Sequence, residues 1–182
     1  MRNGYYIALL ALAVLGAETS RAEKISHNFH EMNSAVPATI TFSNGNKTAT
    51  TTEKVTYTCS GGGSGSNQAK FNYSADTGNE VCAFMVGATS ATLETSEIAN
   101  LDSINIYYYP DAYKEMFVSA QEDGGEWTAQ ALTLIQNGQR GIKLPHVGNY
   151  KIKIQRSGEN FYIFQMDYYT NSTCHCLRVV SE

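Results

Sequence analysis

Residues 148–169 read GNYKIKIQRSGENFYIFQMDYY, and apolar and polar side chains alternate along both halves of this segment. Alternation is typical of a strand with one buried face, because successive side chains point to opposite sides of a strand. The polar Ser-Gly-Glu-Asn interruption at 157–160 has the composition of a turn. We therefore expect two strands, at 150–155 and 161–169. Their predicted core residues are Tyr150, Ile152 and Ile154 in the first strand, and Tyr162, Phe164, Met166 and Tyr168 in the second.

Short strands and turns also fill the chain that precedes this segment. Further strands are expected at 55–59, 69–73, 81–86, 103–109, 115–120, 127–135 and 141–144. Ile104, Ile106 and Tyr108 share one face of the strand at 103–109. Residues 96–101 are expected to form a single turn, and residues 23–50 are only loosely patterned. Because no long window keeps a helical period, the predicted fold is all-β, an antiparallel two-sheet β-sandwich of jelly-roll type.

Composition and charge narrow the class of protein. The chain has 182 residues, with 17 acidic and 13 basic side chains, and a formal net charge of -4. This charge provides no basic surface for binding phosphates, so nucleic acid is not an expected partner. The 12 Tyr and 15 Gly residues favour strands and turns.

The N-terminus has the pattern of a secretory signal peptide. A short basic region that contains Arg2 is followed by an apolar run from Tyr5 to Leu15, which is too short to serve as a membrane span. Small residues precede a predicted cleavage site after Ala22, and a cut after Ala17 is the alternative. We therefore expect residues 1–22 to be removed, residues 23–182 to form one domain, and the protein to be secreted or periplasmic.

Export places the four cysteines in an oxidising compartment, where disulfides are expected. They are Cys59, Cys82, Cys174 and Cys176. Cys174 and Cys176 are too close to pair without strain, so Cys59 and Cys82 bond either to these two or to each other. Binding of a metal by Cys174-His175-Cys176 is the alternative, but a strand would send the imidazole to the opposite face from the thiols. No metal site or cofactor is expected.

The second half of the chain resembles a known family of domains. The segment SAQEDGGEWT at 119–128, with its Asp-Gly-x-x-Trp turn, and the strand GNYKIKI at 148–154 occur in the order found in discoidin and galactose-binding-like domains. The resemblance covers about residues 101–170. It implies a sandwich of the kind that is appended to secreted polysaccharide-degrading enzymes, where such modules bind carbohydrate. Asp123 belongs to the turn itself, and Trp127 is expected to return to the core, with a sugar-stacking role as the alternative.

The expected ligand is an extracellular glycan. A sugar presents an apolar face to an exposed aromatic ring, and its hydroxyls need hydrogen-bonding side chains nearby. Tyr107 and Tyr109 point away from the face that holds Tyr108, and Tyr113 lies at a loop tip, so these rings could stack on a sugar. Arg140 and Arg156 occur in or near Gly-containing turns, where they could bind sugar hydroxyls or the carboxylates of an acidic sugar. The predicted binding site therefore consists of five residues: Tyr107, Tyr109, Tyr113, Arg140 and Arg156.

No convergent catalytic set occurs in the sequence. The segment from His27 to Glu31 has neither of the zincin spacings, and no Ser lies in a nucleophile elbow. A non-catalytic carbohydrate-binding protein is therefore the first hypothesis. The alternatives are a structural or adhesive protein that docks another surface protein, and a small polysaccharide-degrading enzyme of similar fold. A groove with two carboxylates, or with a Tyr together with His or Arg, would favour the enzyme.

Overall fold

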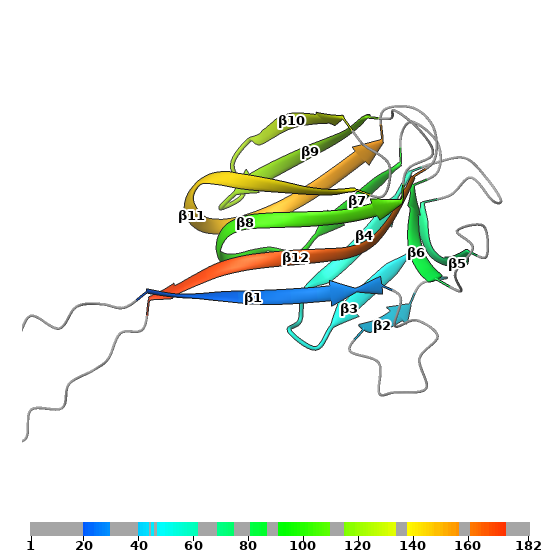
Figure 1. Ribbon diagram of the computed structural model, residues 1–182, viewed down its shortest axis with the longest axis horizontal. Coiled ribbons are helices and arrows are strands. Elements are labelled where there is room, and N and C mark those ends of the chain that lie inside the picture. The colour runs from blue at the N-terminus through cyan, green and yellow to red at the C-terminus, as the bar shows by residue number, and fades with distance from the viewer. Residues whose placement is uncertain are drawn as a thin grey trace, which may run out of the picture.

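The computed structural model describes residues 20–29, 40–43, 45, 47–61, 69–74, 81–86, 91–109, 115–133, 138–156 and 161–173. These residues form twelve strands, and every pairing between them is antiparallel (Figure 1). The strands are β1 (Ser20–Asn28), β2 (Ile40–Ser43), β3 (Thr48–Thr51), β4 (Thr56–Ser60), β5 (Lys70–Ser74), β6 (Val81–Val86), β7 (Thr92–Thr95), β8 (Ile98–Tyr109), β9 (Glu115–Glu122), β10 (Trp127–Thr133), β11 (Gln139–Arg156) and β12 (Phe161–Thr173). The predicted all-β antiparallel sandwich is confirmed.

Strand β11 belongs to both layers of the sandwich. Its first half pairs with β8, β8 pairs with β12, and β12 pairs with β1. The first residues of β12 also pair with β6, which in turn pairs with β5. The second half of β11 pairs with β9 on one side and β7 on the other, and this second layer runs in the order β10-β9-β11-β7-β4-β3-β2. We call these the β8 layer and the β7 layer; in Figure 1, β7 and β4 lie behind β8 and β12, and β9 and β10 are drawn above them.

A bulge lets β11 pass from one layer to the other. Ser103 on β8 faces Lys143, and Leu101 faces Gly148. A step of two positions along β8 therefore corresponds to a step of five positions along β11. Pro145 lies inside this bulge. It has no N–H to donate, and a bulged position does not need one because it forms no ladder hydrogen bond. The strands predicted at 141–144 and 150–155 are therefore two parts of one bent strand.

The core lies between the two layers, as the alternation predicts for most strands. The side chains of Ile104, Ile106 and Tyr108 on β8 are fully buried, and Tyr150, Ile152 and Ile154 on the second half of β11 are buried on the inner face of the β7 layer. The hydroxyls of Tyr57 on β4 and Tyr168 on β12 are 2.7 Å apart. This buried contact connects the two layers directly.

The predicted core face of β12 is only half right. Met166 and Tyr168 are buried, but Tyr162 and Phe164 are partly exposed, and Ile163 is buried in their place. The reason is a one-residue bulge, since Ile163 faces Tyr108 and Gln165 faces Tyr107 on β8. A bulge adds one residue to one strand, and this reverses the inward and outward positions on either side of it.

The first half of the chain contains more strand than its sequence indicates. Residues 20–28, 40–43 and 48–51 form β1, β2 and β3. The expected turn at 96–101 is wrong, because β8 already begins at Ile98, and Ser96 continues from β7 with its N–H donating to the Thr56 carbonyl. These segments are short or weakly alternating, and they become strands through partners far away in the sequence.

The predicted signal peptide lies mostly outside the described residues. Strand β1 begins at Ser20, and its first three residues pair with Asn171, Ser172 and Thr173 of β12. Cleavage after Ala22 would remove these three residues from the ladder, whereas cleavage after Ala17 would leave β1 whole. Within the described residues, no helix has the length and apolar character needed to cross a membrane.

Cys59 is the one predicted disulfide partner whose side chain is described. It is buried in β4, where burial raises the pKa of its thiol, and it forms no disulfide within the described residues. The backbone of Cys82 lies in β6, while its side chain, with Cys174 and Cys176, lies outside the described residues. The disulfides therefore stay a prediction.

If the chain is exported as its N-terminus predicts, we expect no reactive thiol after denaturation without a reductant, because an oxidising compartment would pair all four cysteines. Titration of thiols in denaturant, before and after reduction, checks this. Reduction should release four thiols, the number of cysteines in the chain. A thiol signal before reduction would contradict the predicted pairing of all four.

Candidate functional site

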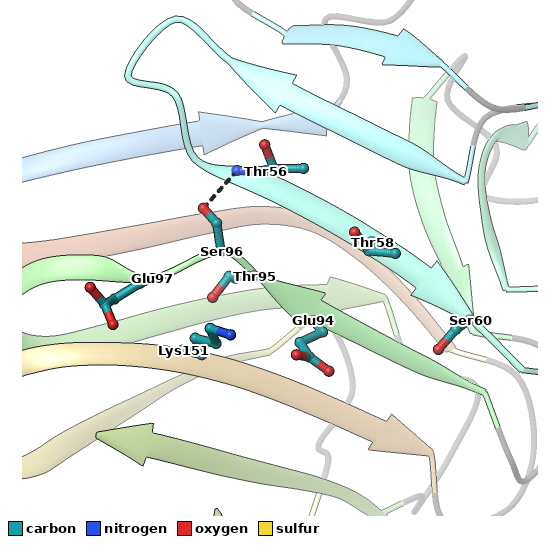
Figure 2. A pocket seen from close by; sticks show the side chains of 8 residues that line it. All are labelled: Thr56, Thr58, Ser60, Glu94, Thr95, Ser96, Glu97 and Lys151. Carbon is teal, nitrogen blue, oxygen red and sulfur yellow. Dashed lines mark hydrogen bonds between the residues drawn. The ribbon is translucent and has the colours of Figure 1, made fainter. Parts of the chain in front are cut away.

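A hollow of about 360 Å³ lies on the outer face of the β7 layer. It is lined by side chains of β4, β7, β11 and the link from β7 to β8, shown together in Figure 2. The lining residues are Thr56, Thr58, Ser60, Glu94, Thr95, Ser96, Glu97 and Lys151. Strand alternation creates this surface, because the core-facing residues Tyr57, Leu93 and Ile152 send their polar neighbours outward.

Part of the hollow is fixed by internal hydrogen bonds. The Thr56 N–H donates to Ser96 Oγ at 3.0 Å, which is drawn in Figure 2, and the hydroxyls of Ser60 and Thr92 are 2.7 Å apart. The Ile152 N–H donates to Thr95 Oγ1 at 2.9 Å. These bonds hold the neighbouring strands and their side chains in one arrangement.

The charged side chains of the hollow take no part in these internal hydrogen bonds. Within the described part of the chain, Glu94, Glu97 and Lys151 form no ion pair and no side-chain hydrogen bond. The hollow thus offers two carboxylates that accept hydrogen bonds and one ammonium that donates them. A ligand rich in hydroxyls could use both kinds of group.

Trp127 lies on the same outer face as the hollow, two strands from Lys151, and not in the core, so the predicted core role is wrong. Its side chain is partly exposed, and Lys153 Nζ lies 4.0 Å from the centre of a ring of the indole. Trp127 is the first residue of β10, an edge strand among the described residues, where it pairs with Gln121. At this position, Ala120 faces the core and Gln121 and Trp127 face outward.

The predicted residue Tyr107 lies on the opposite outer face, that of the β8 layer. Its ring packs at 6.0 Å from that of Phe164, and its hydroxyl donates to Asp167 Oδ2 at 2.9 Å. Burial of this hydroxyl raises the pKa of Tyr107, and the bond to Asp167 raises it further. The ring remains partly exposed, but its polar end already has a partner.

Asp167 is the centre of a polar network on this face. Its side chain is 0% exposed, and it accepts hydrogen bonds from Ser26 at 2.5 Å, Gln165 at 2.8 Å and Tyr107, with Lys24 Nζ at 2.8 Å. Burial by itself would raise the pKa of Asp167, but the four donors outweigh it and hold that pKa below its usual value. The network joins β1, β8 and β12.

The other predicted site residues are not brought to Tyr107. Arg140 is exposed on β11 and pairs with Ile106, whose side chain points to the core. Because paired residues share a face, the side chain of Arg140 leaves the sheet on the face opposite to Tyr107. Tyr109 ends β8 and Arg156 ends β11, but their side chains lie outside the described residues. Tyr113 lies outside them altogether.

A second polar cluster surrounds the β11 bulge. His146 Nε2 lies 2.5 Å from Glu122 Oε1 and 3.5 Å from the hydroxyl of Tyr150. Burial raises the pKa of Tyr150, as does the neighbouring carboxylate of Glu122. Gly148 makes this contact possible, because a Cβ there would lie 2.6 Å from Glu122 Oε1. Across all described residues, no three His, Cys, Asp or Glu side chains gather as metal ligands do.

Neither a known protein family nor a curated protein matches the sequence. Several solved structures are similar to it in fold. A family two carbohydrate esterase from Cellvibrio japonicus is 9% identical with a TM-score of 0.47, over 82% of this chain and 34% of the esterase. The chain therefore spans about a third of the length of that enzyme.

Two carbohydrate-binding modules match over most of their own length. A family 61 module, solved with β-1,4-galactotriose, is 15% identical with a TM-score of 0.43, over 64% of this chain and 88% of the module. The family 32 module from C. perfringens NanJ, solved with galactose, is 18% identical with a TM-score of 0.44, over 63% of this chain and 93% of the module. This chain therefore covers a far larger share of both modules than of the esterase.

Proposed function

We propose that this protein is a secreted, non-catalytic carbohydrate-binding protein, and that it binds glycan in the hollow over β4, β7 and β11. The observation that supports this is the set of Glu94, Glu97 and Lys151 side chains among Thr and Ser hydroxyls, which form no ion pair with any residue that the structure describes. Every sugar hydroxyl is both a donor and an acceptor, so it needs acceptors and donors within reach of each other. This hollow supplies both on a rigid sheet.

Stacking of a sugar on Tyr is the second part of the proposal. The partly exposed ring of Tyr107, next to Phe164, gives the β8 layer an aromatic surface of its own. We propose Tyr107, with Tyr109, Tyr113 and Arg156, as a second binding surface, separate from the hollow. Arg140 starts from the opposite face of the sheet and is not part of this surface. Its polar groups are largely committed to the Asp167 network, so we expect it to bind more weakly.

The two surfaces can be separated with single variants. Lys151→Ala and Glu94→Gln should each weaken glycan binding by about 10-fold or more, because a hydrogen bond to a charged group contributes about 1.5–3 kcal/mol and 1.4 kcal/mol is tenfold in affinity. Tyr107→Ala should have a smaller effect. A glycan array followed by titration calorimetry on the strongest glycan measures all three.

Lys143→Ala is the matched control, since this exposed lysine pairs with Asp102 on the β8 layer, away from the hollow. It should bind like the unmodified protein. If Tyr107→Ala abolished binding and Lys151→Ala did not, the glycan site would lie on the β8 layer. If the unmodified protein bound no glycan, the proposal would be wrong, and a protein-docking surface would take its place.

Glycoside hydrolysis is a second candidate function, because the hollow contains two carboxylates, Glu94 and Glu97. Glycosidases use such a pair, one as the acid and the other as the base or nucleophile. The same screen tests this if each bound polysaccharide is analysed for new reducing ends. Release of reducing ends that is lost in Glu97→Gln would replace binding with hydrolysis as the function.

A further inference from the structure

The polar row that crosses the hollow continues beyond it to Trp127. Lys151 faces Gln121 of β9, and Gln121 faces Trp127 of β10. Directly opposite residues of antiparallel strands share one face of the sheet. Lys151, at the rim of the hollow, is therefore on the same face as the indole, two strands away.

A second row runs parallel to the first. Lys153 faces Glu94 of β7, and Glu94 faces Thr58 of β4. The ammonium of Lys153 then reaches across to the indole of Trp127, at 4.0 Å. Together these residues form a continuous band over five neighbouring strands, which we call the outer strip: Thr58, Glu94, Lys151, Lys153, Gln121 and Trp127.

The length of the outer strip exceeds that of a single sugar. It crosses four inter-strand gaps from β4 to β10, and at about 4.8 Å per gap this is about 19 Å. It is bounded at one end by the hollow and at the other by an aromatic ring. A hollow with an aromatic ring beyond it fits successive units of one chain better than one terminal sugar.

The charges of the outer strip favour an uncharged ligand. Two ammoniums, from Lys151 and Lys153, are matched by the carboxylates of Glu94 and Glu97 at the hollow. A polyanion would meet two carboxylates and a chain whose net charge is already -4. A polycation would meet the two ammoniums.

We propose that the outer strip binds an internal stretch of a linear, uncharged polysaccharide, which lies across the strands from β4 to β10. The inference rests on the proposed function and extends it from the hollow to Trp127. The hollow hydrogen-bonds one part of the chain, and the indole packs on the apolar face of a sugar further along. Lys153 holds the indole in position from the β11 side.

Titration with oligosaccharides of increasing length tests this proposal. The probes are the β-1,4-linked galacto-, xylo-, manno- and cello-oligosaccharides from one to six units, with oligogalacturonides as charged counterparts. For the series that binds, affinity should rise with length. Trp127→Ala should weaken hexamer binding by about tenfold and leave dimer binding unchanged, whereas Lys151→Ala should weaken both.

Trp127→Phe is the conservative variant and should keep most of the hexamer affinity, while the melting temperature of each variant reports on folding. Affinity that does not increase beyond one or two units, or hexamer binding that is unaffected by Trp127→Ala, would overturn the outer strip but leave the hollow as the site. Tighter binding of oligogalacturonides than of every uncharged series would also overturn it. Absence of binding by every probe would overturn the proposed function and this extension together.

Discussion

Asp167→Ala should lower the free energy of unfolding by about 2–4 kcal/mol. The variant loses the acceptor of Ser26 and Tyr107 and the partner of Lys24, in a network that joins three strands. A hydrogen bond to a charged group contributes about 1.5–3 kcal/mol, but bonds within one network do not add fully. Denaturant unfolding at neutral pH measures the loss.

The effect of this variant should depend on pH. Because the folded protein holds the pKa of Asp167 below its usual value, the carboxylate contributes its full stability above the pKa of an unfolded Asp, about 3.9. That contribution is lost as the pH falls through the lower, folded pKa. The difference between the unmodified protein and Asp167→Ala should therefore be constant near neutral pH and shrink at acidic pH.

Asp102→Ala is the matched control for Asp167→Ala. Asp102 also pairs with a lysine on the β8 layer, Lys143, but that ammonium is largely exposed. Surface ion pairs contribute about 0–1 kcal/mol, so this variant should change stability far less. Equal losses from the two variants would show that burial of Asp167 has no energetic consequence.

Tyr57→Phe should lower the free energy of unfolding by about 2–3 kcal/mol. Its hydroxyl lies 2.5 Å from His27 Nδ1 and 2.7 Å from the hydroxyl of Tyr168, and all three side chains are buried. Removing one hydroxyl removes two hydrogen bonds, and a buried polar group left without a partner costs about 1–3 kcal/mol. Thermal or denaturant unfolding of the variant checks the value.

Tyr168→Phe should cost less, because its hydroxyl retains only a long contact with Met166 besides Tyr57. The double variant should lose less than the sum of the two single variants, since both remove the same bond. Tyr162→Phe is the control: Tyr162 is partly exposed and has no hydrogen bond among the described residues. A strictly additive double variant would show that the two hydroxyls are not coupled.

Local alternation was enough to predict the core of the long strands. Ile104, Ile106 and Tyr108 alternate with polar residues without interruption, and so do Tyr150, Ile152 and Ile154. The same reasoning failed on β12 because the bulge at Phe164 depends on pairing with β8, and no residue there marks it in the sequence. The bulge in β11 is marked in the sequence by Pro145, because a proline interrupts the alternation of apolar and polar residues and cannot donate a ladder hydrogen bond.

The candidate site could not be predicted in the same way, because long-range pairing assembles it. Thr58, Glu94 and Lys151 are separated by tens of residues, and only the order β4-β7-β11 brings them side by side. The lysines at 151 and 153 were visible as the outward positions of a strand, but their neighbours were not. Trp127 was misplaced because a strand edge exposes an aromatic residue that a central strand would cover.

Because β11 belongs to both layers, we expect the two layers to unfold together. Its first half belongs to the ladder with β8 and its second half to the ladders with β7 and β9, so separation of the two layers would break this one strand and expose the core between them. Amide hydrogens in the paired parts of β11, on both sides of the bulge, should then exchange with deuterium through complete unfolding and at one common free energy. On this expectation neither layer opens before the other, and the hollow on the β7 layer persists until the whole fold is lost.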